Sequence, residues 1–306
     1  MSRNPHGKIL ALFPGALGDL LCCWPALNEL RRSVGAPLTL AAREAWLDAL
    51  PVEAATRRSI DGRDIADLFA SGPLRDATRT LFSDCIRVES WTGHGDDNFA
   101  HRLAQACGGA VAVHPFRAFR PGEHASQYYA RCVGVSPRVE PLPIRTAAAE
   151  WADEVCRRRG MEVDTLVIHA GSGSAHKNWE GMAAVAAAWR AEGGRVIALL
   201  GPAEDERATR MTHDVAVRGE QLDRVAALLA RAPRYLGNDS GISHLAALVG
   251  TRGVALFGPT DPRAWHPLGP GIRVLSAPRP CRRCGPHRFC THRLSIGLVL
   301  EALRAV

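Results

Sequence analysis

The sequence predicts an α/β protein made of two domains, each built on a parallel sheet. Its 306 residues suit two domains of about 150 residues each. Short apolar runs alternate with segments of helical periodicity, which is typical of parallel sheets with right-handed crossovers. A proline-rich stretch interrupts this alternation near the middle of the chain. We therefore expect a first domain over 1–136, a linker over 137–145 and a second domain over 146–306.

The first domain opens with an apolar strand predicted over 8–13, followed by a turn over 14–18. From Asp19 the apolar residues take helical spacing, which predicts a helix ending near residue 34, and a second strand is predicted over 38–42. In the second domain the predicted strands are 165–169, 195–200, 235–237 and 253–257, and the predicted helices are 147–159, 179–192, 222–230, 242–249 and 295–305. Ligands of such sheets bind in loops at the carboxyl ends of the strands.

Composition narrows the class of protein. Apolar residues make up 46% and charged residues 23% of the chain, as in a soluble globular protein. No apolar run reaches the roughly 18 residues of a membrane span, and no secretory leader pattern is present. Most of the nine cysteines lie in apolar segments, which favours buried, reduced thiols. We expect a cytoplasmic protein with at most peripheral membrane contact.

The net charge of +7 is unevenly distributed. Residues 1–145 hold 17 Lys and Arg against 15 Asp and Glu, whereas residues 146–306 hold 21 against 16. Anions such as phosphates are therefore expected ligands of the second half. The sequence has no dense basic and aromatic stretch and no recognisable nucleic-acid module, so no nucleic-acid partner is expected.

The first chemical motif is the segment 14–19 (PGALGD), which joins a strand to a helix. Gly15 and Gly18 allow the backbone to turn tightly, and Asp19 follows beside the free amides of a helix start. Spacing alone leaves two interpretations open. Asp19 either caps the helix or favours the helix dipole, or it acts as a general base at the carboxyl end of the strand.

The second motif is the segment 169–179 (HAGSGSAHKNW), where a strand opens into small and hydroxyl-bearing residues. Ser172, Gly173, Ser174 and Lys177 form an arrangement of the phosphate-binding type, although the P-loop spacing is absent. A flexible loop with an exposed lysine is the alternative. Only two of the 38 basic residues are lysines, so a lysine in this loop favours a need for a compact ammonium group.

The third motif is the segment 237–262, which begins GNDSGISHLAA and ends VALFGPTDP. Asp239, Ser240 and Gly241 precede a predicted helix, and His244 lies one turn into it. This arrangement predicts a second anion-binding helix N-terminus. An ordinary capped helix with a buried histidine is the alternative.

Together the three segments resemble the signature of glycosyltransferase family nine, the ADP-heptose:lipopolysaccharide heptosyltransferases. That signature has a Gly-Asp turn after the first strand, an H-x-G-S-x…K-x-W loop, and the GNDSGxxHLAA…VALFGPTDP segment. The resemblance is weak between residues 40 and 125. It implies a GT-B architecture, with two Rossmann-like domains facing an interdomain cleft, an acceptor on the first domain and a nucleotide-sugar on the second.

The resemblance also implies roles for individual residues. Asp19 resembles the family's catalytic aspartate, and Gly15 and Gly18 belong to the acceptor-side loop. Glu204 falls where an acidic residue of the family meets the ribose. The other donor-binding residues implied are Ser172, Gly173, Ser174, Lys177, Asp239, Ser240, Gly241 and His244.

No metal ion is expected for catalysis, because GT-B enzymes need no D-x-D site and the sequence contains no such triplet. Fixed donors would then stabilise the departing ADP. The cysteines Cys281, Cys284 and Cys290 do have the spacing of metal ligands. A structural metal or a disulfide is therefore an alternative to reduced thiols in a basic loop, which we favour.

We predict an inverting glycosyltransferase that moves a heptose or similar sugar from an ADP-sugar to the hydroxyl of a saccharide or glycolipid. The default acceptor is the lipopolysaccharide inner core. A family-nine enzyme acting on a soluble metabolite or a protein is one alternative, and a non-catalytic nucleotide-sugar-binding module is another. An oxidoreductase is disfavoured, because no G-x-G-x-x-G follows a strand with an acidic residue downstream.

Overall fold

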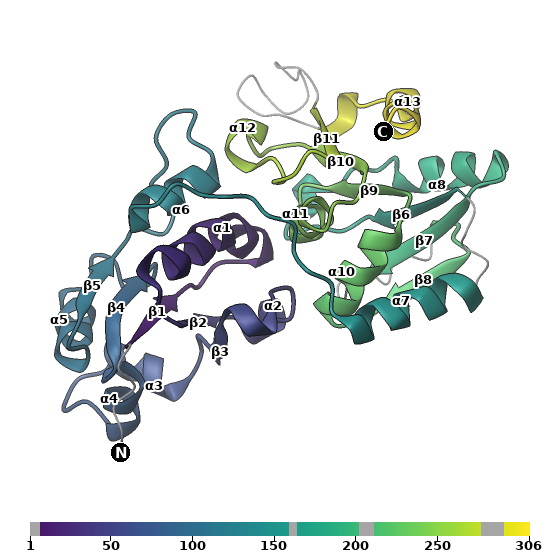
Figure 1. Cartoon of the computed structure of the whole chain (residues 1–306). Helices are drawn as coiled ribbons and strands as arrows, with labels where there is room; N and C mark the ends of the chain where they lie inside the picture. Colours follow the sequence, from purple (N-terminus) through teal and green to yellow (C-terminus); the bar gives the residue numbers. More distant parts are fainter. Residues whose placement is uncertain (1–6, 159–163, 202–210, 277–290) are drawn as a thin grey trace. The chain divides into compact units, whose positions relative to one another are not determined.

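The computed structural model describes residues 7–158, 164–201, 211–276 and 291–306. The chain divides into two compact units, Met1–Arg138 and Val139–Val306 (Figure 1). Each unit is an α/β structure whose described strands pair only in parallel. The predicted fold class of two parallel-sheet α/β domains is confirmed. The division falls inside the segment predicted as a linker.

The first unit contains a five-stranded sheet in the order β3-β2-β1-β4-β5. Its strands are β1 (Lys8–Leu12), β2 (Leu38–Ala42), β3 (Thr56–Ser59), β4 (Cys85–Ser90) and β5 (Ala110–Val113). Its helices are α1 (Leu17–Val34), α2 (Glu44–Leu47), α3 (Arg63–Ala66), α4 (Asp76–Phe82), α5 (Asp97–Ala106) and α6 (Ala125–Val133), with short 3-10 turns η1 (Val52–Ala54) and η2 (Asp67–Phe69).

Helix α1 packs along α6 in the first unit (Figure 1). It begins at Leu17, two residues before the predicted start, so that Asp19 is its third residue. It ends at Val34, and its C-cap Gly35 has a φ of 70°, in the left-handed region that favours glycine. Beneath it, the rings of Phe13, Trp91 and Tyr129 meet edge to face with centroids 5.4–5.7 Å apart, an arrangement that aromatic quadrupoles favour.

The second unit contains a six-stranded sheet in the order β11-β10-β9-β6-β7-β8. Its strands are β6 (Thr165–His169), β7 (Arg195–Leu200), β8 (Val215–Arg218), β9 (Arg234–Asn238), β10 (Gly253–Phe257) and β11 (Ile272–Ser276). Its described helices are α7 (Thr146–Arg158), α8 (Met182–Ala191), α10 (Leu222–Arg231), α11 (Gly241–Leu248), α12 (Pro262–Trp265) and α13 (Ile296–Arg304), with 3-10 turns η3 (Ala175–Lys177) and η4 (Thr291–Arg293).

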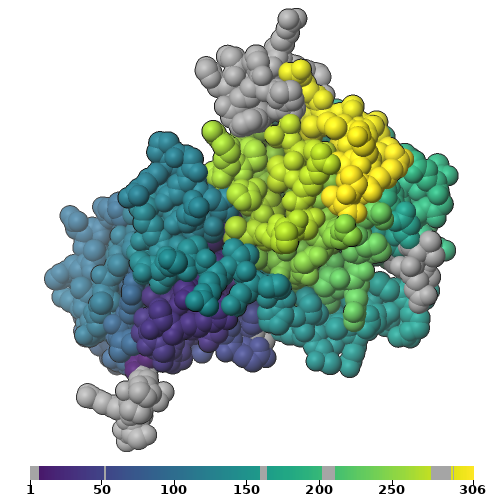
Figure 2. Space-filling model, turned by 45° about the horizontal axis from the view of Figure 1, so that its top comes forward, coloured from purple at the N-terminus to yellow at the C-terminus, as the bar shows by residue number. Residues whose placement is uncertain are grey.

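The last helix, α13, belongs to the second unit. It packs on α8 and on strands β9 and β10. In Figure 2 its yellow surface adjoins the yellow-green surface of the preceding segments of this unit. Ser295 caps it, because the Ser295 hydroxyl accepts a hydrogen bond from the Leu298 N–H, as predicted from sequence. Within the described ranges, no helix is long and apolar enough to cross a bilayer.

Two strands of the second sheet were not predicted from the sequence, and both lie at the edges of the sheet. Strand β8 reads VAVR and β11 reads IRVLS, with alternating burial. Edge strands bury less of their surface than central strands, so they lack the continuous apolar runs that reveal buried parallel strands. Helix α8 also begins three residues later than predicted, at Met182.

Each sheet has a topological switch point, where the strand order reverses. In the first sheet this point lies between β1 and β4, and in the second it lies between β6 and β9. Doubly wound sheets bind ligands in the crevice outside the carboxyl ends of the strands at such a point. The loops that follow β1, β6 and β9 therefore hold the best-placed side chains.

Candidate active site

Asp19 is a buried carboxylate held by an arginine that sequence analysis did not identify. Its side chain is only 5% exposed. Arg117 donates from Nε to Oδ1 at 3.0 Å and from Nη2 to Oδ2 at 2.9 Å. This bidentate arrangement fixes the plane of the carboxylate. Arg117 follows β5 by a few residues and so lies at the same edge of the sheet as Asp19. This position was the sequence feature that could have identified it as a partner of Asp19.

The protonation chemistry of Asp19 follows from its burial. Burial raises the pKa of Asp19, and the Arg117 guanidinium and the N–H groups of Ala16 and Asp19 only partly offset this rise. A carboxylate with a raised pKa accepts a proton more readily than an ordinary one. Such perturbed groups are typical of acids and bases in active sites.

The capping interpretation of Asp19 is wrong in its simple form. The N-cap of α1 is Ala16, and no side chain caps that position. Asp19 lies in the first turn, where the helix dipole favours a negative charge. Gly15 allows the loop to pass over this carboxylate, because a Cβ there would stand 2.8 Å from the Asp19 Cβ and 2.5 Å from the Phe13 ring. Gly18 lies within the same first turn.

The second and third motifs meet in the second unit. The loop after β6 and the start of α11 after β9 come together because β6 and β9 are neighbours in the sheet. The Lys177 Nζ lies 2.7 Å from Asp239 Oδ2, and the Asp239 side chain is only 6% exposed. Lys177 is thus a partly buried ammonium in an ion pair, which excludes the alternative of a free, exposed lysine.

The loop around Ser172 is held by its own hydrogen bonds. The Ser172 Oγ lies 2.6 Å from the carbonyl oxygen of Ser174 and 2.8 Å from Asn178 Oδ1. The Ser174 N–H donates back to that hydroxyl at 3.3 Å. Gly173 is exposed, and a Cβ there would meet no atom within 4 Å. The tip of the loop is therefore open on one side and can approach a ligand.

The start of α11 combines a cap with two histidines. Ser240 is the N-cap, and its hydroxyl accepts from the Ser243 N–H. The same hydroxyl lies 3.3 Å from His169 Nδ1. Gly241 begins the helix, and His244 is buried one turn further on. The capped-helix interpretation is correct for Ser240, and the free amides of the first turn still offer an anion-binding end.

Asn238 is a second residue that sequence analysis missed. It is fully buried at the end of β9. Its Nδ2 donates to the carbonyl oxygen of Ala170 at 2.8 Å, and its Oδ1 accepts from the Trp179 N–H at 3.0 Å. Both ends of the Lys177 loop are therefore fastened to one amide. A polar residue closing an apolar strand was the available signal.

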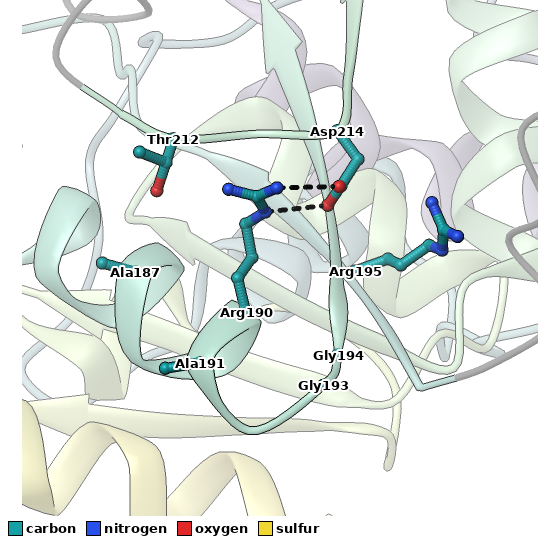
Figure 3. Close-up of a pocket in the computed structure, with 8 residues that line it drawn as sticks. All are labelled: Ala187, Arg190, Ala191, Gly193, Gly194, Arg195, Thr212 and Asp214. Atoms are coloured by element: carbon teal, nitrogen blue, oxygen red, sulfur yellow. Dashed lines mark hydrogen bonds and ion pairs between the residues drawn. The ribbon is translucent and has the colours of Figure 1, made fainter.

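A cavity of about 320 Å³ lies beside the Lys177 loop. It is lined by both ends of the loop, by the start of α8 and by Met211. A wider depression of about 540 Å³ lies elsewhere on this unit, around Arg190 and the first residue of β7, Arg195 (Figure 3). There Arg190 binds Asp214 through two hydrogen bonds of 3.1 Å. The charges of Arg190 and Asp214 in this depression therefore neutralise each other, and we assign no ligand to the depression.

Some of the predicted site residues lie outside the described residues. These are Glu204 and the three cysteines Cys281, Cys284 and Cys290. Within the described part of the chain, no group of three or more His, Cys, Asp or Glu side chains could hold a metal ion.

The fold and the site define a class of protein: two Rossmann-like α/β units, of which the second carries a lysine loop and a helix N-terminus suited to phosphates. The family follows from comparison. Residues 141–290 match the profile of glycosyltransferase family 9 (heptosyltransferase). The second unit is therefore a glycosyltransferase family 9 domain, and the predicted family and enzyme class are confirmed.

Individual relatives agree with this assignment. Lipopolysaccharide heptosyltransferase 1 of Escherichia coli K12 is 35% identical over 82 residues, which span 26% of each chain. The structure of E. coli ADP-heptose LPS heptosyltransferase II superposes with a TM-score of 0.72 at 17% identity, covering 97% of this chain and 98% of that one. At this identity the superposition shows the shared fold.

One similar structure contains iron. The dodecameric glycosyltransferase TibC of enterotoxigenic E. coli, described as iron-containing, superposes with a TM-score of 0.57 at 16% identity, covering 98% of this chain and 73% of that one. At this identity the superposition shows the shared fold. Our prediction of reduced thiols at Cys281, Cys284 and Cys290, with a metal as the alternative, concerns residues outside the described ranges.

Proposed function

We propose that this protein is an inverting glycosyltransferase that moves a heptose or similar sugar from an ADP-sugar to an acceptor hydroxyl. The observation that carries the proposal is the meeting of the Lys177 loop with the start of α11 at the switch point of the second sheet. One ammonium group and one set of free helix amides are thus offered at the place where doubly wound sheets bind nucleotides.

The donor would bind through its phosphates. The Lys177 ammonium is held by Asp239, and it would share its charge with the pyrophosphate of a bound donor. The Ser172–Ser174 loop and the amides at Gly241 would supply further donors. As the bond between the anomeric carbon and ADP breaks, negative charge grows on the leaving phosphate. Fixed donors stabilise this charge, at about 2–4 kcal/mol for each donor removed.

Asp19 would act as the general base. The acceptor oxygen forms a bond to the anomeric carbon, the bond to ADP breaks, and the acceptor's proton passes to the Asp19 carboxylate. Direct displacement inverts the anomeric centre. The raised pKa of Asp19 favours this proton transfer, and the two hydrogen bonds from Arg117 hold the carboxylate in one orientation.

The donor and acceptor identities rest on comparison. ADP-heptose as donor is supported by the name of heptosyltransferase II, and lipopolysaccharide as acceptor by the names of both E. coli relatives. We propose its inner core as the part that accepts the sugar. The first 145 residues carry a surplus of only two positive charges, and an acidic, phosphorylated acceptor would favour a more basic face. A soluble metabolite or a protein is therefore the second candidate acceptor. We propose a cytoplasmic location with at most peripheral contact with a membrane, and catalysis without a metal ion.

Release of ADP tests the proposal. The full-length protein is incubated with ADP-heptose and a mixture of candidate acceptors, ADP is quantified, and products are sought as a mass increase of one heptose. ADP release that depends on an acceptor is expected. Binding of ADP-heptose without transfer to any acceptor would instead identify a non-catalytic nucleotide-sugar-binding module.

A further inference from the structure

The Lys177 loop, residues 171–178, is closed at its base by the side chain of Asn238. The Asn238 Nδ2 donates to the Ala170 carbonyl oxygen at 2.8 Å, directly before the loop, and Oδ1 accepts from the Trp179 N–H at 3.0 Å, directly after it. One end of the loop offers an acceptor and the other a donor. The side chain at position 238 therefore needs a donor and an acceptor on the same planar group, which an amide supplies.

Burial does not hold the outer part of the loop. From residue 173 to residue 178 every residue is partly or fully exposed. The Lys177 N–H donates to the Ser174 carbonyl oxygen at 3.0 Å, but this bond lies within the loop and fixes its shape rather than its place on the sheet. The place of the loop is set where it is bonded to other segments, at its base and at the ion pair of Lys177 with Asp239.

The backbone of Asn238 is fixed independently of the loop. Asn238 ends β9, which pairs with β10 on the side opposite β6. The Ser243 hydroxyl donates to the Asn238 carbonyl oxygen from α11 at 2.6 Å, and the Asn238 side chain is fully buried. The amide is therefore a fixed point, and through it the loop takes its place from the sheet and from α11.

The same amide is linked to the groups that would bind the donor. An amide nitrogen carries two protons, and beyond its bond to the base of the loop the Asn238 Nδ2 lies 3.4 Å from Asn178 Oδ1. That oxygen lies 2.8 Å from the Ser172 hydroxyl. Lys177 precedes Asn178 in the chain, and its partner Asp239 follows Asn238. Asn238 thus fixes the spacing between the Ser172 hydroxyl, the Lys177 ammonium and the start of α11.

We propose that Asn238 is a positioning residue for the transfer, which holds the Lys177 loop in its binding form before the donor arrives. This role rests on the proposed function, because the pyrophosphate is the ligand for which the loop would be arranged. A loop that is already ordered avoids the entropic cost of ordering on binding. Ordering the backbone of even one freed residue would weaken binding about tenfold. This cost affects the ground state and the transition state alike, so a loosened loop raises KM and leaves kcat unchanged.

Amide hydrogen exchange tests the positioning without any ligand. In Asn238→Leu, which keeps a similar branched shape but has no hydrogen-bonding group, the amides of residues 171–178 should exchange about tenfold faster, because two hydrogen bonds at the base of the loop are lost. Thr251→Val is the matched control. Thr251 is buried in the same unit, and its hydroxyl donates to the Leu229 carbonyl oxygen at 2.7 Å. The control should leave exchange in the loop unchanged. Unchanged loop exchange in folded Asn238→Leu would overturn the proposal.

Donor kinetics test the consequence for transfer. In Asn238→Leu the KM for ADP-heptose should rise about tenfold, while kcat per folded molecule stays within about twofold of the wild type. Thr251→Val should lose stability and keep both constants. A merely structural role of Asn238 would reduce the amount of folded protein and leave KM unchanged. An unchanged KM in folded Asn238→Leu, or an equal rise in Thr251→Val, would therefore refute the positioning role.

Asn178→Ala keeps the proposal testable if Asn238→Leu does not fold. Asn178 is partly exposed, and this variant removes the link between the Asn238 amide and the Ser172 hydroxyl. The loss of one such bond should raise KM about threefold, and an unchanged KM together with unchanged loop exchange would count against the role of Asn238. Faster loop exchange in the variants of a protein that neither binds ADP nor transfers heptose would support the positioning by Asn238 and refute the proposed function.

Discussion

Replacing Asp19 by Asn separates the chemical role of this residue from its structural one. Asn has nearly the same size and retains one acceptor oxygen, but it cannot take the proton of an acceptor hydroxyl. If Asp19 is the general base, kcat should fall by about 10²–10⁴-fold. If Asp19 only anchors Arg117 and the start of α1, turnover should change little.

The effect on stability follows from the contacts of Asp19. The variant loses one of the two hydrogen bonds from Arg117. Because the Arg117 side chain is 51% exposed, this loss costs about 1 kcal/mol or less. The raised pKa of Asp19 acts in the opposite direction, because the folded protein disfavours the buried charge and a neutral amide relieves that cost. The melting temperature should therefore stay within about 4 °C of the wild type.

Three measurements on one preparation test this prediction: the melting temperature, the affinity for ADP and the rate of acceptor-dependent ADP release. We expect near-native values for the first two and a large loss in the third. An Asn variant that keeps more than about a tenth of the wild-type kcat would remove Asp19 from the mechanism. A fall in melting temperature well beyond the expected range would show that our account of its contacts is wrong.

Asp67→Asn is the matched control in the same unit. Asp67 is also buried and also binds arginines, through Arg75 and Arg102, but it has no part in the proposed site. The hydrogen bond from the Arg75 backbone N–H is the main interaction that lowers the pKa of Asp67, to about 2. Its ionised form therefore stabilises the fold. This variant should lose stability and keep its turnover per folded molecule, the reverse of the pattern expected for Asp19.

Three further results are expected. Lys177→Ala should weaken ADP binding and slow transfer. KM should rise and kcat should fall together, because the ammonium would contact the pyrophosphate before and during bond breaking. Unchanged kinetics would restrict the role of Lys177 to its ion pair with Asp239. ADP should raise the melting temperature more than UDP or GDP at equal concentration, and equal shifts would argue against an adenine nucleotide donor. The folded pKa of Asp67, about 2, lies below the usual 3.8, so its stabilisation is present above pH 4 and is lost as the pH falls toward 2. Over this interval the stability measured by urea unfolding should fall by about 2 kcal/mol more in the wild type than in Asp67→Asn, because the other carboxylates with lowered pKa values, Glu123, Glu154 and Asp214, titrate in both proteins. An acid-induced loss of equal size in both proteins would contradict the assignment.

The central strands could be predicted from sequence alone. The strands 38–42, 165–169, 195–200 and 253–257 have the predicted bounds. All but one of their residues are buried, so each is a short apolar run bounded by turn residues. The motif residues Asp19, Lys177 and Asp239 were also recognisable, because glycines and a strand-to-helix junction mark their positions locally.

Only the tertiary structure decided which of these residues meet. Arg117 and Asp19 are 98 positions apart, and an arginine after a strand has no local mark that names its partner. Lys177 reaches Asp239 because β6 and β9 are adjacent. Periodicity and propensity act over a few residues, whereas ion pairs and hydrogen bonds need atoms within a few ångströms. Strand order alone supplies that proximity, which is why the sequence yields the candidate groups and the fold yields the sites.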